Sequence, residues 1–154
     1  MTAHDDATRI EVDQYFPHPP EKVWRALTTP ELMAQWLMPN DFEPTVGHRF
    51  TFQGQPIEQT GFSGVVACEV LEVVPPVRLQ YSWTDANPPE GTAVPADWTI
   101  TWTLQEEGTG TRLLLEHAGF DLDDPIQQIS RKFMSGGWRS HVLRRLGDVL
   151  DQAE

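Results

Sequence analysis

An alternation of apolar and polar residues is the longest regular pattern in this chain, and it recurs from residue 47 to residue 119. It is clearest in DWTITWTL, residues 97–104, where Trp98, Ile100 and Trp102 share one phase. Successive side chains of a strand point to opposite faces of a sheet, so a period of two predicts strands with one buried face. The segments are separated by short turns, which predicts an antiparallel meander. Residues 97–105 are therefore expected in a strand and not in a helix.

Residues 8–16, TRIEVDQYF, alternate in the same way and predict a further strand ahead of the meander, which brings the sheet to about six strands. Two short helices are expected next, at about residues 19–28 and 30–37. Prolines stand where the first turn of each helix would be, and apolar residues recur at helical spacing behind them. The Pro/Gly-rich segment 85–96 is expected to be a mobile loop at the rim of the sheet.

A long helix is predicted at the end of the chain, because apolar residues recur at spacings of three and four between residues 124 and 152. One continuous helix of that length would measure about 43 Å. Gly136 and Gly137 interrupt it, and each glycine costs a helix about 1 kcal/mol relative to alanine. Two interpretations stay open: the pair leaves room for a ligand beside the helix, or it separates two shorter helices.

Composition narrows the possible partners. A chain of 154 residues that is 39% hydrophobic is expected to be one globular domain, with residues 1–7 flexible. A formal charge of −12 disfavours nucleic acid and anionic membranes, and no apolar run is long enough for membrane insertion. The first residues lack the pattern of a signal peptide, which favours a cytoplasmic location.

Reactive or metal-binding groups are scarce in the sequence. Cys68 is the only cysteine, and its place in an apolar strand predicts a buried, unreactive thiol. The histidines lack metal-ligand spacing, so neither a metal nor another cofactor is expected. The five histidines are His4, His18, His48, His117 and His141.

Four segments resemble a known family in their amino-acid sequence and in their order along the chain: PPEKVWRALTTPELMAQWL, CEVLEVVPPVRLQYSW, GTRLLLEHAGF and GWRSHVLRRLGDVL. They are similar to the bacterial proteins named after the activator of heat-shock protein 90 ATPase, within the START-like (SRPBCC) superfamily. The resemblance implies an α+β helix-grip fold, in which a curved antiparallel sheet wraps around a long C-terminal helix. It also implies a cavity between the sheet and that helix.

Candidate ligand-binding residues follow from the inward phase of the strands and one face of the helix. Most are aromatic, as the walls of small-molecule pockets generally are. They are Phe52, Tyr81, Trp83, Trp98, Trp102, Leu115, His117, Phe133, Gly137, Trp138 and His141. His117 is either a core histidine bonded to a backbone carbonyl or to Tyr81, or a polar anchor or general base. Glu69 shares the phase of Leu71 and Val73 and is expected to point inward with them, unless a salt link at the strand end holds it.

Three functions remain in competition. The first is non-catalytic binding of a small hydrophobic or aromatic molecule in the cavity. The second is a polyketide-cyclase-like or hydrolase-like enzyme that uses His117 and Glu69 for acid–base work. The third is a co-chaperone that stimulates a heat-shock protein 90 ATPase, which is disfavoured because the resemblance covers only the C-terminal domain of the eukaryotic activators. A homodimer stays open.

Overall fold

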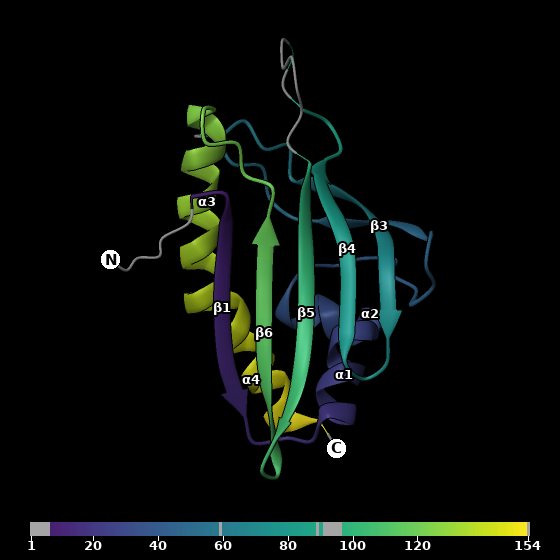
Figure 1. Ribbon diagram of the computed structural model, residues 1–154. Coiled ribbons are helices and arrows are strands. Elements are labelled where there is room, and N and C mark those ends of the chain that lie inside the picture. Colours follow the sequence, from purple (N-terminus) through teal and green to yellow (C-terminus); the bar gives the residue numbers. More distant parts are fainter. Residues whose placement is uncertain (1–6, 59, 89, 91–96, 154) are drawn as a thin grey trace, which may run out of the picture.

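A six-stranded antiparallel sheet in the order β1-β6-β5-β4-β3-β2 forms the framework of the computed structural model, which describes residues 7–58, 60–88, 90 and 97–153 (Figure 1). The strands are β1 (Arg9–Phe16), β2 (Arg49–Gln53), β3 (Val65–Val74), β4 (Arg78–Asp85), β5 (Trp98–Glu107) and β6 (Gly110–Ala118). The helices are α1 (Pro20–Thr28), α2 (Pro30–Trp36), α3 (Pro125–Gly137), the π-helical turn η1 (Trp138–Val142) and α4 (Leu143–Gln152).

These elements confirm the predicted α+β helix-grip architecture. Both short helices begin and end within a residue of their predicted limits, and residues 98–105 of the predicted strand lie in β5. The expected flexibility of residues 1–7 and the expected rim loop at 85–96 concern segments that lie wholly or partly outside the described residues. None of the helices in the described part of the chain is both long and apolar enough to cross a membrane.

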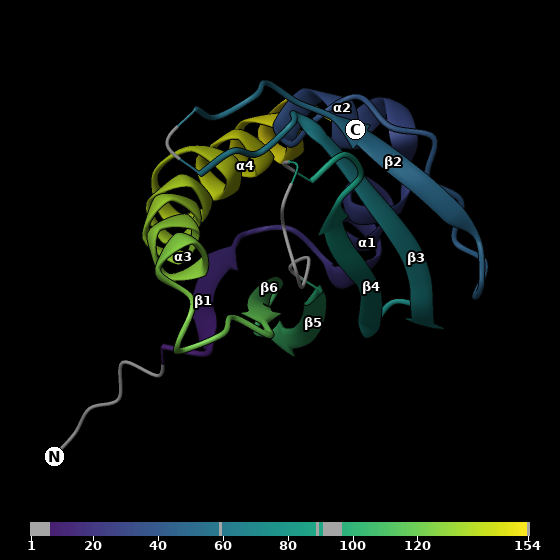
Figure 2. The ribbon, with the colours of Figure 1, turned by 90° about the horizontal axis from the view of Figure 1, so that it is seen from above.

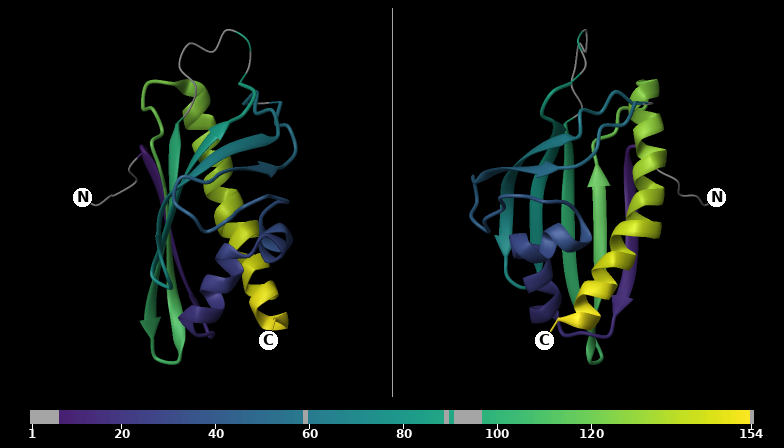
Figure 3. Two further views of the ribbon diagram at one scale, coloured as in Figure 1. Left: turned by 90° about the vertical axis from the view of Figure 1, so that its right-hand side faces the viewer. Right: turned by 180° about the vertical axis from the view of Figure 1, so that it is seen from behind.

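The sheet curves around the C-terminal helix, so that sheet and helix together enclose the interior (Figure 2). Helices α1 and α2 contact α4 and close one end of this enclosure. At the other end α3 lies beside β1, and the connection between β2 and β3 passes across toward α3 (Figure 3). This second end is where a molecule could enter the interior.

The C-terminal helix occupies the predicted part of the chain, but it is not a regular α-helix throughout. Asp124 caps its first turn, because the Asp124 carboxylate accepts hydrogen bonds from the backbone N–H groups of Ile126 and Gln127. Directly after the glycine pair the chain forms the π-turn η1, in which the N–H of Leu143 donates to the carbonyl of Trp138, five residues back. The helix changes direction at this point (Figure 3).

Strand β3 presents the opposite face from the one predicted for its first half. Val66, Cys68 and Val70 point inward and are buried. A register shift between Val70 and Glu72 interrupts the pairing of β3 with β4. The prediction that Leu71 faces the interior is therefore wrong, because Leu71 is exposed on the outer face. Of the two alternatives for Glu69 the salt link holds, since Glu69 lies on the outer face and forms a salt bridge with Arg49 at 3.7 Å.

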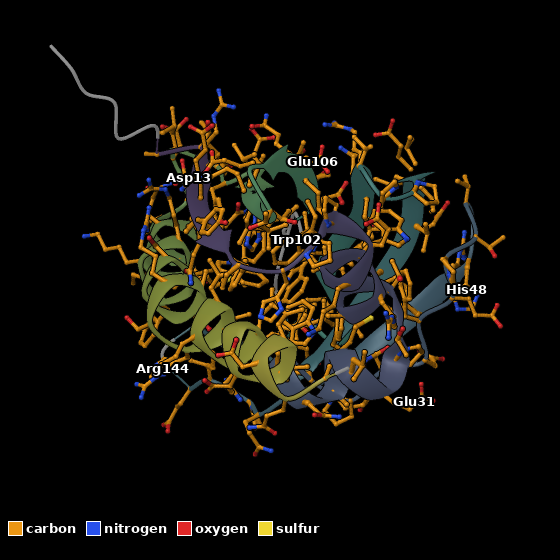
Figure 4. The ribbon with its side chains drawn as sticks, turned by 90° about the horizontal axis from the view of Figure 1, so that it is seen from below. Asp13, Glu31, His48, Trp102, Glu106 and Arg144 are labelled. Atoms are coloured by element: carbon orange, nitrogen blue, oxygen red, sulfur yellow. The ribbon has the colours of Figure 1, made fainter. Side chains whose placement is uncertain are left out.

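Aromatic side chains fill the interior between the sheet and the helices. The indole of Trp102 packs edge-on against Trp36 at 5.6 Å and against Trp138 at 5.7 Å between ring centroids. Its N–H donates to the hydroxyl of Tyr81 at 3.0 Å, so these two buried polar groups satisfy each other. Figure 4 shows Trp102 surrounded by side chains, whereas the labelled charged residues lie at the periphery.

Candidate functional site

A pocket of about 270 Å³ opens at the α3 end of the molecule. Its walls come from the α2–β2 connection, the β2–β3 connection, strands β4 and β5, and helix α3. Aromatic and aliphatic side chains predominate, which is the usual character of a small-molecule site. The lining residues are Met38, Gln55, Ile57, Thr60, Phe62, Trp83, Trp98, Ser130, Phe133 and Met134.

The β2–β3 connection forms one wall of the pocket through a small turn. Ile57 and Phe62 face each other in an isolated β-bridge, in which the N–H of Ile57 donates to the carbonyl of Phe62 at 3.0 Å. The ends of the connection are held close together, because the N–H of Gly54 donates to the carbonyl of Gly64 at 2.6 Å. Gly64 has φ +99°, and a Cβ there would lie 3.0 Å from the backbone of Pro56, so only glycine suits this position.

Trp83 and Trp98 form the sheet side of the pocket and are opposite each other in the β4–β5 pairing. The N–H of Trp98 donates to the side-chain oxygen of Gln127 at 3.2 Å, and the same oxygen accepts the N–H of Asp121 at 2.8 Å. Gln127 is buried, so this bond ties Trp98 to the first turn of α3. The ring of Trp98 thus has a fixed orientation at the pocket.

His117 lies behind these two tryptophans and is fully buried. Its ring centroid is 5.2 Å from that of Trp98 and 5.8 Å from that of Trp83. The indole N–H of Trp138 donates to Nδ1 of His117 at 3.1 Å. The predicted bond between His117 and Tyr81 is wrong, because the Tyr81 hydroxyl is paired with Trp102 instead. Burial lowers the pKa of His117 to about 3, so the imidazole is neutral near pH 7.

The predicted site residues divide into three groups. Trp83, Trp98 and Phe133 line the pocket. The second group lies in the packed interior: Phe52, Tyr81, Trp102, Leu115, His117 and Trp138. The space expected between Trp138 and the sheet tryptophans is filled by their own rings, at 5.7 Å to Trp102 and 5.9 Å to Trp83.

Gly137 and His141 make up the third group, on the helix. Gly137 follows Ser130 by seven residues and Met134 by three, so it shares the pocket face of α3. A Cβ at Gly137 would meet no atom within 4 Å, and the same holds for Gly136, which is exposed. His141 is exposed in the π-turn and is not among the residues that line the pocket.

Sequence reasoning missed the pocket residues that come from connections, namely Met38, Gln55, Ile57, Thr60 and Phe62. The connection around residue 57 has no regular period. The available signal was the presence of Ile57 and Phe62 in an otherwise polar, glycine-containing stretch. Met134 and Ser130 were also missed as lining residues, although Met134 stood in the predicted apolar stripe.

The outward side of α3 is unusually apolar. Gln127 is its only buried residue among those described, whereas Ile126, Ile129 and Phe133 are 47%, 40% and 47% exposed. Leu122, just before the helix, is 60% exposed and continues the row. Because Phe133 belongs both to this stripe and to the pocket lining, the apolar surface continues from the outside of α3 to the pocket rim.

Other reactive groups lie apart from the pocket. Cys68 is buried in β3 as predicted, and its burial raises the pKa of the thiol. His18 pairs with Asp151 and Lys22, and His48 with Asp41 and Glu43, in places remote from the pocket lining. Among the described residues no three His, Cys, Asp or Glu side chains converge. His4 lies outside the described residues.

Residues 17–151 match the sequence profile of the family described as Activator of Hsp90 ATPase homolog 1-like protein. The chain belongs to this family. No curated protein matches it by sequence. Family membership, together with the observed fold, confirms the resemblance that the four sequence segments carried.

Solved structures of similar proteins share the fold over almost the whole chain. Protein MLL2253 from Mesorhizobium loti is 38% identical, with a TM-score of 0.80 over 95% of this chain and 98% of its own. Protein BH1534 from Bacillus halodurans is 28% identical, with a TM-score of 0.69 over 92% of this chain and 96% of its own. CalU16 from Micromonospora echinospora is 26% identical, with a TM-score of 0.70 over 94% of this chain and 76% of its own.

Proposed function

We propose that this protein binds a small hydrophobic or aromatic molecule in the pocket between α3, the β2–β3 connection and the tryptophans of β4 and β5. The observation that carries the proposal is the 270 Å³ pocket with Phe62, Trp83, Trp98 and Phe133 in its walls. An apolar cavity of about 150 Å³ is enough to bind benzene. A volume nearly twice as large suits a molecule with two or three fused rings.

Binding without chemistry is favoured over the enzymatic alternative. His117 and Glu69 cannot act together as an acid–base pair, because they lie on opposite faces of the sheet. His117 is buried inside, and Glu69 forms a salt bridge with Arg49 on the outer face. Nδ1 of His117 is already occupied by the N–H of Trp138, so it is not available as a base. The family description refers to Hsp90 ATPase activation, but an apolar internal pocket favours a small molecule over a chaperone partner.

The test is titration with N-phenyl-1-naphthylamine, a neutral probe that fluoresces in apolar surroundings and accepts energy from nearby tryptophans. Ser130→Phe should fill the pocket, because Ser130 lines it from α3. The matched control is Gly136→Phe, which adds the same ring to an exposed position of the same helix with open space around it. We expect probe binding by the wild type and by the control, and at least a tenfold weaker affinity in Ser130→Phe.

Two outcomes would count against the proposal. If the wild type bound no probe at concentrations up to its solubility, the pocket would not be a general apolar site. If Ser130→Phe and Gly136→Phe bound the probe equally well, the probe would be held elsewhere. Far-ultraviolet circular dichroism of each variant shows whether the fold is retained.

A further inference from the structure

Nε2 of His117 is a buried polar atom with no hydrogen-bond partner, the only such side-chain nitrogen or oxygen in the described part of the chain. Nδ1 of the same ring accepts the indole N–H of Trp138 at 3.1 Å. A neutral imidazole carries one proton, and this bond assigns that proton to Nε2. The atom without a partner is therefore a hydrogen-bond donor.

Buried donors in folded proteins almost always have an acceptor, so this exception requires an explanation. Three aromatic rings besides Trp138 contact the imidazole, namely those of Trp83, Trp98 and Phe120, at 5.8, 5.2 and 4.8 Å between centroids. These rings and that of Trp138 pack around the imidazole. None of them offers a strong acceptor, since an indole nitrogen only donates and the face of an aromatic ring accepts an N–H only weakly.

The position of this donor connects it with the pocket. Trp83 and Trp98 line the pocket and also pack on His117, so the donor is one layer of side chains behind the pocket wall. A ligand group that enters between the two tryptophans would reach it. Trp98 keeps its orientation through its bond to Gln127, so such an entry requires a change in the tilt of Trp83.

We propose that the Nε2–H of His117 recognises an acceptor oxygen at the inner end of the bound molecule, and that the ligands are neutral aromatic carbonyl compounds. This inference rests on the proposed function, because it assigns the ligand class of the same pocket. It gives His117 a binding role as a fixed neutral donor, distinct from acid–base catalysis.

The surroundings disfavour charged groups at this position. A carboxylate would be desolvated among aromatic rings with no cation at hand, because no lysine or arginine lines the pocket. Burial keeps the pKa of His117 far below neutrality, so the imidazole supplies no positive charge either. An ammonium group carries only hydrogen-bond donors, so it could not pair with the Nε2–H donor of His117. A carbonyl oxygen is an uncharged acceptor, so it can accept the hydrogen bond of the Nε2–H of His117.

The test compares two ligands that share one carbon skeleton, 9-fluorenone and fluorene, which differ in a carbonyl group against a CH₂ group. Their affinities are measured by quenching of tryptophan fluorescence for the wild type and for His117→Phe, which keeps an aromatic ring and removes the donor. We expect the wild type to bind 9-fluorenone roughly tenfold more tightly than fluorene. In His117→Phe the ratio should fall to about one while fluorene is still bound.

A second measurement needs no variant. In wild-type protein labelled with ¹⁵N-histidine, the Nε2 proton of His117 should move downfield when 9-fluorenone is added and stay in place with fluorene. Equal affinities of the wild type for both compounds, or an unmoved Nε2 resonance on saturation with 9-fluorenone, would overturn the inference and leave the proposed function standing. Binding of neither compound, together with no binding of N-phenyl-1-naphthylamine, would instead overturn the proposed function.

Discussion

Mild acid should destabilise this protein through His117, because the folded state holds the imidazole in its neutral form. Burial lowers the pKa of His117 from 6.5 to about 3, and no other cause contributes to the shift. In the unfolded chain the same group becomes protonated near its ordinary pKa. Between these two pKa values the unfolded state binds more protons than the folded state, so the free energy of unfolding falls as the pH falls.

The magnitude follows from the difference between the two pKa values. Below about pH 6, each pH unit should remove about 1.4 kcal/mol from the free energy of unfolding. From about pH 7.5 to about pH 5 the loss due to His117 is roughly 2 kcal/mol, and near pH 3 it reaches roughly 4–5 kcal/mol. Domains are generally stable by only about 5–15 kcal/mol, so the effect is large enough to measure.

The assay is urea unfolding at several pH values, followed by tryptophan fluorescence, for the wild type and for His117→Phe. The variant lacks the titrating group, and the other ionisable residues are common to both proteins, so the difference between the two profiles isolates His117. Loss of the hydrogen bond to Trp138 lowers the stability of the variant by an amount that does not depend on pH. We expect the wild type to lose about 2 kcal/mol more than the variant between about pH 7.5 and about pH 5. Parallel profiles would refute the reasoning.

Two further outcomes are expected. Gly137→Leu and Gly136→Leu should each raise the free energy of unfolding by about 0.5–1 kcal/mol, because both remove a helical glycine with open space around it. Only Gly137→Leu, on the pocket face, should weaken N-phenyl-1-naphthylamine binding. Equal effects of the two variants on probe binding would contradict the assigned helix faces. Cys68 should resist iodoacetamide in the folded protein and react in urea, because burial raises the pKa of its thiol; mass spectrometry of the folded protein would contradict this if it showed rapid alkylation.

The sheet and its helices were predictable because their patterns are local. The alternation around Trp98, Ile100 and Trp102 needs only the geometry of a strand, and all three side chains are buried as predicted. The same rule failed in β3, where the register shift at Val70 separates two phases of one apolar run. In VVACEVLEVV apolar residues occur in both phases, so alternation alone could not decide which side faced inward.

The pocket could not be predicted to the same extent, because it forms where segments distant in sequence meet. Ile57 and Phe62 acquire a role only when the β2–β3 connection turns toward α3. His117 was recognisable as an inward polar residue, yet its partner Trp138 depends on the orientation of the helix across the sheet. Side-chain periodicity indicates which face a residue occupies and gives no information about which helix residue will meet it.

The π-turn η1 separates two differently packed halves of the C-terminal helix. In the half after the turn, Leu143, Leu146, Val149 and Leu150 are buried, and Arg144 and Arg145 are exposed. In the half before it, Gln127 is the only buried residue among those described in α3. The π-turn therefore lets one helix serve two purposes. The second half of the helix packs into the core. The first half has one face beside the pocket, and its neighbouring apolar stripe is exposed at the pocket rim.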